Sequence, residues 1–183
     1  IGRQLGDGMA RKKDGDVLDL YTNLNGGTKL GTAGTSFKSI NVQAIIAYAK
    51  ANKFGNQLYI LHHPNAVAYL SKEAATVSTS NAIPDGWTAD LLQSFWSGLK
   101  PMNNVAIFED GNISEDSSGD GIGVIADKTA MAALNSVETR TERQRDASLR
   151  ATEVVMTSDY GIFELDDSRG ASFIAEIGDL SFS

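Results

Sequence analysis

The feature that most constrains this chain is a succession of short apolar segments between residues 41 and 75. Residues 41–54 form an amphipathic stretch whose apolar side chains fall on one helical face: Val42, Ile45, Ile46 and Ala49. The apolar run 58–61 predicts a buried strand, and it leads into a His-His-Pro triplet. Pro64 fits the first turn of a second helix over residues 65–75, since that position needs no amide hydrogen. This order of elements indicates a scaffold without obvious catalytic chemistry.

The ends of the first helix carry typical signals. Ser39 or Asn41 can cap its start. Gly55 suits the left-handed conformation that often follows a last turn. Because the helical stripe and the apolar strand follow each other closely, we predict one buried cluster that contains Val42, Ile45, Ile46, Leu58, Ile60 and Leu70.

Further elements flank this unit on both sides. Residues 1–14 are typical of the end of a helix, which the sequence Asp14-Gly15-Asp16 should break. A short helix over 17–24 and a loop over 25–35 should follow. Downstream we expect a polar connection over 76–84, a helix between Thr88 and Gly98, strands over 105–108 and 122–125, and an exposed loop over 110–121.

The apolar pattern of the last fifty residues predicts two strands. Residues 154–165 and 171–177 are apolar and strand-like, and Gly170 gives the segment between them a residue that hairpin loops favour. Short helices combined with strands that are distant in the sequence indicate an α+β fold rather than alternating βαβ units.

The composition argues against several classes of function. The 183 residues include no cysteine, which rules out disulfides, thiolate metal sites and cysteine nucleophiles. The formal net charge is −7, so the surface repels a phosphate backbone and we expect no sequence-specific nucleic-acid binding. The sequence has no apolar run of about 18 residues, so we expect no membrane span. The chain begins with Ile1 rather than Met, and we expect it to be a piece of a longer protein.

No residue pattern points to a catalytic, cofactor or metal site. His62 and His63 are the only histidines, and neighbours on a strand point to opposite faces, so we expect packing and capping roles. The loop from Asp110 resembles a calcium loop in composition. However, Glu115 and Gly121 stand where such a loop needs a glycine and a bidentate glutamate. The glycines lack the spacing of a phosphate loop. We therefore expect neither an enzyme nor a bound cofactor.

A charge-dense segment between residues 138 and 150 carries both signs. One interpretation is an exposed face with many ion pairs. The other is a contact between subunits, where complementary charges set the register between copies. The candidate subunit interface therefore comprises Arg140, Glu142, Arg143, Arg145, Asp146 and Arg150.

Four pieces of the sequence, taken in order, resemble the major capsid proteins of tailed bacteriophages, whose HK-type capsid fold is shared with encapsulin shells. Residues 1–11 resemble the end of that family's long spine helix. Residues 41–70, with the His-Pro pair, resemble its helix–strand–helix core. The apical strands of the family are matched by 105–108 and 122–132, and its closing peripheral strands by 142–146, 153–155 and 160–162.

The resemblance implies an α+β subunit with a central sheet, flanking helices and peripheral strands. Residues 1–40 and 136–183 would form a peripheral region, and residues 41–135 an axial region. Such a protein assembles with copies of itself, in the host cytoplasm, into an icosahedral shell that encloses the phage genome. Its location would be the virion, with other virion proteins as further partners, and it would need no cofactor.

Three other functions stay open at this point. An encapsulin-like compartment would have the same fold, and a cargo-binding site would distinguish it. An enzyme, such as a hydrolase using acids near the loop 110–121, would show a pocket with several convergent polar groups. A monomeric binding module would differ from all of these in particle size.

Overall fold

The computed structural model describes residues 2–77 and 105–178 of the chain. The predicted helix between Thr88 and Gly98 lies outside the described residues, as does most of the connection before it. The helices are α1 (Gly2–Tyr21), α2 (Ser39–Ala51) and α3 (Pro64–Val77), with a short 3-10 turn at Asp167–Arg169. The strands are β1 (Leu58–His62), β2 (Ala106–Glu109), β3 (Asp120–Asp127), β4 (Met131–Asp146), β5 (Ala151–Glu164) and β6 (Gly170–Glu176).

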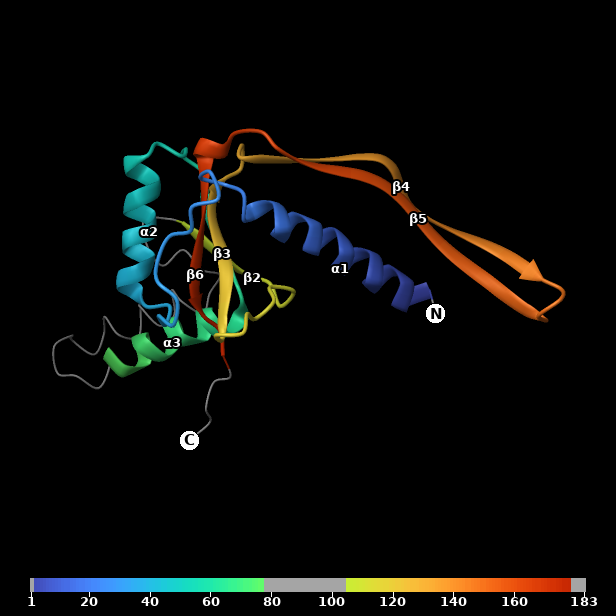
Figure 1. The fold of residues 1–183 in the computed structure, drawn as a ribbon, viewed down its shortest axis with the longest axis horizontal. Coiled ribbons are helices and arrows are strands. Elements are labelled where there is room, and N and C mark those ends of the chain that lie inside the picture. Colours follow the sequence, from blue (N-terminus) through green and yellow to red (C-terminus); the bar gives the residue numbers. More distant parts are fainter. Residues whose placement is uncertain (1, 78–104, 179–183) are drawn as a thin grey trace.

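Four of the strands form a mixed sheet in the order β2-β1-β3-β6 (Figure 1). β1 runs parallel to β2 and antiparallel to β3, and β3 runs antiparallel to β6. The register places Ile60 between Ile107 and Ile125 at the centre of the sheet. The predicted α+β fold is confirmed, as are the helix–strand–helix unit and the strands expected from residues 105 and 122.

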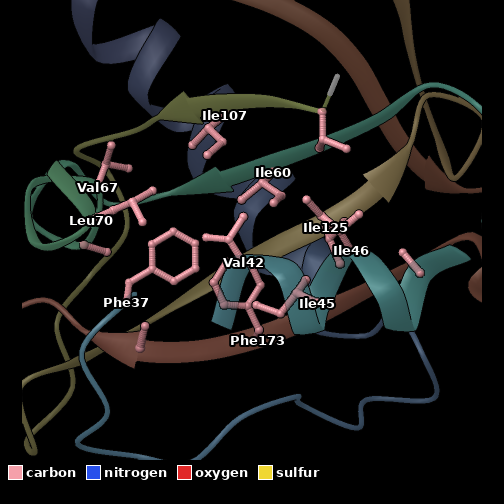
Figure 2. Close-up of a cluster of buried hydrophobic side chains, with 14 of the residues drawn as sticks. Phe37, Val42, Ile45, Ile46, Ile60, Val67, Leu70, Ile107, Ile125 and Phe173 are labelled. Atoms are coloured by element: carbon pink, nitrogen blue, oxygen red, sulfur yellow. The ribbon is translucent and has the colours of Figure 1, made fainter. Parts of the chain in front are cut away.

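One face of this sheet carries the main hydrophobic core, which α2 and α3 cover (Figure 2). Ile45 and Ile46 reach from α2 toward the sheet, and Leu70 reaches toward it from α3. Full burial of each such side chain stabilises the fold by about 1.5–3 kcal/mol. The predicted cluster is confirmed, because the core contains Val42, Ile45, Ile46, Leu58, Ile60 and Leu70.

The opposite face of the sheet packs against the end of α1. Ile125 belongs to the main core, whereas its neighbours on β3 belong to a second buried cluster on the α1 side. β3 is therefore buried on both faces, which explains its apolar sequence. The second cluster consists of Tyr21, Leu24, Val124, Ala126 and Ala130.

β4 and β5 form a separate antiparallel hairpin that projects away from the four-stranded sheet and past the start of α1 (Figure 1). The 14 residues of β5 give this hairpin a length of about 45 Å, at a rise of about 3.3 Å per residue. The register shifts on either side of Val137, an irregularity that bends and twists a hairpin.

The helix break predicted at Asp14-Gly15-Asp16 is wrong, since α1 is one helix of 20 residues. A glycine inside a helix costs about 1 kcal/mol relative to alanine, which tertiary contacts can offset. Here Asp16 pairs with Lys12 one turn earlier and accepts a hydrogen bond from the Tyr160 hydroxyl. Although α1 has the length of a membrane span, neither it nor any other helix in the described part of the chain is apolar enough to cross a membrane.

The predicted ends of α2 are also wrong. Lys38 occupies the N-cap position without a side-chain hydrogen bond, so neither Ser39 nor Asn41 caps the helix. After the helix, Lys53 adopts the left-handed conformation first, with a φ of 59°, and Gly55 follows two residues later with a φ of 148°. A Cβ at Gly55 would lie 2.4 Å from the carboxyl carbon of Asp127. Gly55 is therefore needed for its positive φ and for a close approach between segments, and it does not form the last turn of the helix.

The hairpin predicted between the last two strands is wrong. β5 pairs with β4, whereas β6 pairs with β3, so residues 165–169 carry the chain from one sheet to the other. Gly170 is extended, and a Cβ there would lie 2.6 Å from a methyl carbon of Leu24. Close packing, rather than a turn, explains this glycine. As a result β6 belongs to the same sheet as β1, β2 and β3.

The loop 110–121 is only partly exposed, contrary to the prediction. Most of its residues lie at the surface, but Ile113 belongs to the main core and Asp120 is 1% exposed. Both carboxylate oxygens of Asp120 accept the amide hydrogen of Gly34, at 2.9 and 3.0 Å. The loop is thus held to the segment before α2 by a buried and satisfied carboxylate.

Candidate assembly interface

The six residues of the candidate interface lie on β4 and in the turn after it. Arg140, Glu142, Arg143, Arg145 and Asp146 belong to β4, and Arg150 precedes β5 with a φ of 49°. The structure brings two of them together, with Arg140 Nε 3.3 Å from Glu142 Oε1. Their side chains are 66% and 62% exposed, and such exposed pairs contribute only about 0–1 kcal/mol. The charged side chains of this segment therefore lie largely at the surface.

Asp146 orders the turn at the tip of the hairpin. Its Oδ1 accepts hydrogen bonds from the Ser148 hydroxyl, from the Ser148 amide at 2.8 Å and from the Leu149 amide at 3.3 Å. These bonds hold the pKa of Asp146 below its usual value, with the Ser148 hydroxyl as the largest cause. The ordered turn presents Leu149 at the surface, 75% exposed.

Polar side chains that the sequence analysis did not identify connect α1 to the hairpin. The Tyr160 hydroxyl donates a hydrogen bond to the Asp16 carboxylate, and Lys13 Nζ lies 5.0 Å from the centre of the Tyr160 ring. Lys13 also donates to the Thr139 hydroxyl at 3.3 Å. Bonds from Lys12 and then Tyr160 hold the pKa of Asp16 down, and the bond to Asp16 raises the pKa of Tyr160. Helix α1 thus sets the direction in which the hairpin projects.

The two faces of the hairpin differ in exposure. Every second residue of β5 from Val154 to Ile162 is half-buried, and Tyr160 in this series contacts α1. The residues between them face away from the helix, and nearly all of those are exposed. Alternation should have revealed this in the sequence, but both faces carry apolar residues, as in the pairs Val154-Val155 and Ile162-Phe163.

The sequence analysis also missed a concentration of exposed apolar side chains. Eight large apolar side chains are exposed among the described residues, and six of these lie between residues 134 and 165. A monomer rarely gathers its exposed apolar groups on one projecting element, so the hairpin is the surface best suited to contact another chain. The six residues are Leu134, Val137, Leu149, Val155, Phe163 and Leu165.

The two histidines have the expected packing and capping roles. His62 is fully buried, with ring centres 5.8 Å from Phe37 and 5.0 Å from Phe173, and burial lowers its pKa to about 4. Gly123 leaves room for this ring, because a Cβ there would lie 2.1 Å from His62 Cδ2. His63 Nδ1 accepts the amide hydrogen of Asn65 at 3.2 Å, at the start of α3.

The acidic loop uses its carboxylates to order its own backbone. Asp116 Oδ1 accepts the amides of Ser118 at 2.7 Å and Asp120 at 3.0 Å, and the bond from Asp120 is the largest cause of its lowered pKa. Within the described residues, no group of three or more His, Asp and Glu side chains is placed to hold a metal ion.

A pocket of about 350 Å³ between α2 and β6 is lined mainly by apolar groups, among them Phe37 and Phe173.

Comparison with solved structures identifies the fold. No protein-family model matches the chain, and no curated protein matches its sequence significantly. A structure from Mycobacterium phage Che8 matches with a TM-score of 0.69 and 13% identity, over 94% of this chain and 61% of the phage chain. The holo-SrpI encapsulin of Synechococcus elongatus PCC 7942 matches with a TM-score of 0.67 and 11% identity, over 99% of this chain and 66% of the encapsulin.

A third match is the head structure of Helicobacter pylori bacteriophage KHP40, with a TM-score of 0.60 and 12% identity over 96% of this chain. The chain spans 61–66% of the length of these three structures. It has the fold of phage capsid and head proteins and of encapsulins, the HK-type capsid fold that the sequence resemblance implied.

Proposed function

From this fold we propose that the chain belongs to the major capsid protein of a tailed bacteriophage, which assembles with copies of itself into an icosahedral shell around the genome. The observation that carries the proposal is the projecting hairpin β4–β5 on a fold shared with phage heads. A shell subunit acts through edges that meet other copies, and exposed apolar and charged groups gather on this element. The role is structural rather than catalytic, and the location is the virion after assembly in the host cytoplasm.

An encapsulin-like compartment is the second candidate. It is favoured by the match to the SrpI encapsulin, which covers 99% of this chain with a TM-score close to that of the first phage structure. The contents of purified particles separate the two functions. A capsid encloses nucleic acid, whereas an encapsulin-like shell encloses protein cargo and leaves nucleic acid outside.

The peripheral region proposed for this subunit comprises residues 1–40 and 136–183, and the axial region comprises residues 41–135. The hairpin and α1 support this division, because they contact each other and extend away from the four-stranded sheet (Figure 1). The pairing of β6 with β3 ties the two regions together at the sheet.

The candidate interface on β4 is proposed as a contact between neighbouring subunits. Exposed charges of both signs allow the segment of one copy to complement a neighbour, and repetition multiplies each contact over a symmetric shell. The other virion proteins are proposed as partners of the assembled shell.

Expression of the full-length protein, with electron microscopy of the product, tests the function. We expect shells from the wild-type chain, and an absence of shells under all assembly conditions would overturn the capsid proposal. The double variant Arg143→Glu and Arg145→Glu should keep the wild-type circular dichroism spectrum but lose particles, since it reverses charge at every copy of the interface.

A matched control makes the same change of charge away from the hairpin. Lys50→Glu and Lys53→Glu alter exposed side chains at the end of α2 and should leave particle yield unchanged. If the hairpin variant forms shells as well as this control does, the placement of the interface is wrong while the capsid function stands.

A further inference from the structure

The chain contains one Asn-Gly pair, Asn25-Gly26, in the connection that follows α1. Its sequence suits its backbone, because Asn25, Gly26 and Gly27 all have a positive φ, of 59°, 61° and 73°. Glycine adopts this left-handed conformation without strain, and asparagine tolerates it better than most residues do. The tight turn after α1 therefore explains the pair, but the pair also has a chemical reactivity that the turn does not use.

An Asn-Gly pair is prone to spontaneous deamidation, since glycine has no side chain to hinder ring formation. The backbone nitrogen of Gly26, having lost its proton, attacks the side-chain carbonyl carbon of Asn25. A new C–N bond forms, and the side-chain nitrogen leaves as ammonia with that proton. The resulting succinimide takes up one water molecule and opens to aspartate or isoaspartate at position 25. Water is the only co-reactant, and it reaches this turn, because Asn25 is half-buried and Gly26 is exposed.

Both reacting groups are engaged in the folded chain. The Gly26 amide donates to both carboxylate oxygens of Asp167, at 3.0 Å each. A carboxylate at this distance stabilises the protonated amide, so it opposes the loss of the proton that must precede attack. The Asn25 side chain is held as well, because its Nδ2 donates to the Thr28 carbonyl at 3.1 Å and its Oδ1 accepts from the Tyr48 hydroxyl at 3.3 Å. These bonds restrict the rotation that brings the side-chain carbonyl carbon to Gly26.

The protecting carboxylate comes from a distant part of the chain. Asp167 lies in the 3-10 turn between β5 and β6, 141 residues after Gly26. The Asn25 amide also donates to the Asp167 carbonyl, at 3.3 Å. This contact joins the end of α1 to the base of the hairpin. Local opening of the joint removes the carboxylate from Gly26 without unfolding of the sheet.

The product does not restore the folded arrangement. Aspartate at position 25 presents an oxygen in place of the Nδ2 that donates to Thr28, so two hydrogen-bond acceptors face each other. Isoaspartate lengthens the main chain by one methylene group and therefore shifts Gly26 relative to Asp167. An opening that leads to the reaction is thus irreversible.

We propose that Asn25-Gly26 is a modification site that the contact with Asp167 keeps closed in the folded subunit. Where the end of α1 separates from the turn at Asp167, Asn25 converts to aspartate or isoaspartate by reaction with water. The modification marks chains that have opened at this joint. The inference is independent of the function proposed above, since it concerns a single copy of the chain.

Peptide mass spectrometry of the full-length protein measures the reaction. Trypsin cleavage after Lys13 and Lys29 releases one peptide that contains Asn25 together with Asn23, which precedes Leu24 and serves as an internal reference. In the wild type, Asn25 should deamidate about 10- to 100-fold more slowly in buffer than in urea, the factor expected for one hydrogen bond to a charged group. Equal rates at Asn25 in the two solvents would overturn the proposal.

Variants at position 167 test the role of the carboxylate. Asp167→Ala removes the acceptor, so Asn25 in the folded variant should deamidate about 10- to 100-fold faster than in the wild type. Asp167→Asn keeps an acceptor oxygen without the charge and should give an intermediate rate. Asp19→Ala is the matched control, since it removes an exposed carboxylate near the same turn and leaves the Asp167 contact in place. This control should deamidate at the wild-type rate.

Circular dichroism shows whether each variant is folded. Folded Asp167→Ala protein that deamidates at the wild-type rate would overturn the proposal, because the contact would then not control the reaction. If Asp167→Ala does not fold, the folded Asp167→Asn variant and the wild type in buffer and in urea decide the question in the same way.

Discussion

The Tyr160 hydroxyl on β5 donates a hydrogen bond to the Asp16 carboxylate on α1, across 144 residues of sequence. It is reinforced by Lys13, whose Nζ lies 5.0 Å from the centre of the same ring. Few other specific side-chain bonds join the helix to the hairpin in the described structure. The Tyr160–Asp16 bond therefore limits how freely the hairpin β4–β5 moves relative to α1.

Removal of this hydroxyl should loosen the hairpin without unfolding the sheet. For Tyr160→Phe we expect faster amide hydrogen exchange in β4 and β5 and unchanged exchange in β1 and β3, because the sheet makes no use of this bond. Asp16→Ala should have a similar effect, because it removes the acceptor of this bond. Tyr48→Phe is the control, since it removes a hydroxyl bonded to Asn25 instead. Equal exchange in wild type and Tyr160→Phe would show that the bond does not hold the hairpin.

Gly123 should be one of the least replaceable positions in the sheet. Its Cβ in Gly123→Ala would lie 2.1 Å from His62 Cδ2 and 2.7 Å from the carbonyl oxygen of Leu61. Overpacking of this kind costs about 1–3 kcal/mol in free energy of unfolding. Gly111→Ala has no neighbour within 4 Å and should change stability by less than about 0.5 kcal/mol. Urea unfolding of both variants makes the comparison, and equal stability would contradict the packing described here.

Ile46 is expected to contribute strongly to stability from α2. It is 1% exposed in the main core, so Ile46→Ala should lower the free energy of unfolding by about 2–5 kcal/mol. Ile40→Ala on the same helix removes the same atoms from a residue that is 68% exposed and should cost less than about 0.5 kcal/mol. Thermal and urea unfolding measure the difference. Similar losses of stability at both positions would show that Ile46 does not face the sheet as described.

Stability should fall in acid because of His62. Burial lowers the pKa of His62 from the ordinary 6.5 to about 4. Between these two values His62 is protonated in the unfolded chain and neutral in the folded chain. The contribution of the neutral histidine is full above pH 6.5 and is lost as pH falls toward 4. A pKa difference of this size between the folded and unfolded states corresponds to about 3 kcal/mol in free energy of unfolding.

The measurement for His62 is urea unfolding of wild type and His62→Gln between pH 4 and 7. We expect the stability of the wild type to fall by about 3 kcal/mol more than that of the variant over this range. Parallel curves would show that some other group causes the acid sensitivity.

The local parts of the fold were predictable from sequence because their signals are local. The spacing of Ile45 and Ile46, the apolar run before His62 and the position of Pro64 each act within a few residues, and the unit they predict is present. The core could be predicted from the same spacing. The apolar face of α2 is followed closely in the sequence by a single apolar strand, β1, and the two pack together.

The errors have one physical cause, which is contact between distant segments. Gly170 was taken for a turn residue, but Leu24 packs against it from 146 positions away. The continuity of α1 depends in part on Tyr160. The apolar base of the hairpin could not be recognised either. Ile162 is half-buried and Phe163 is exposed because α1 covers only one face of the hairpin, and the sequence does not show which face that is.

The place of β6 in the sheet has a consequence for synthesis of the protein. The main core includes Phe173, so it cannot close until the ribosome has made the whole hairpin and then this strand. At about 5–20 residues per second, the roughly 40 residues between β3 and β6 delay closure by about 2–8 s. During that interval β3 has an open edge, and nascent chains on the same messenger are its nearest partners. Slower translation of residues 128–169 should therefore lower the yield of correctly folded subunits, even though the amino-acid sequence is unchanged.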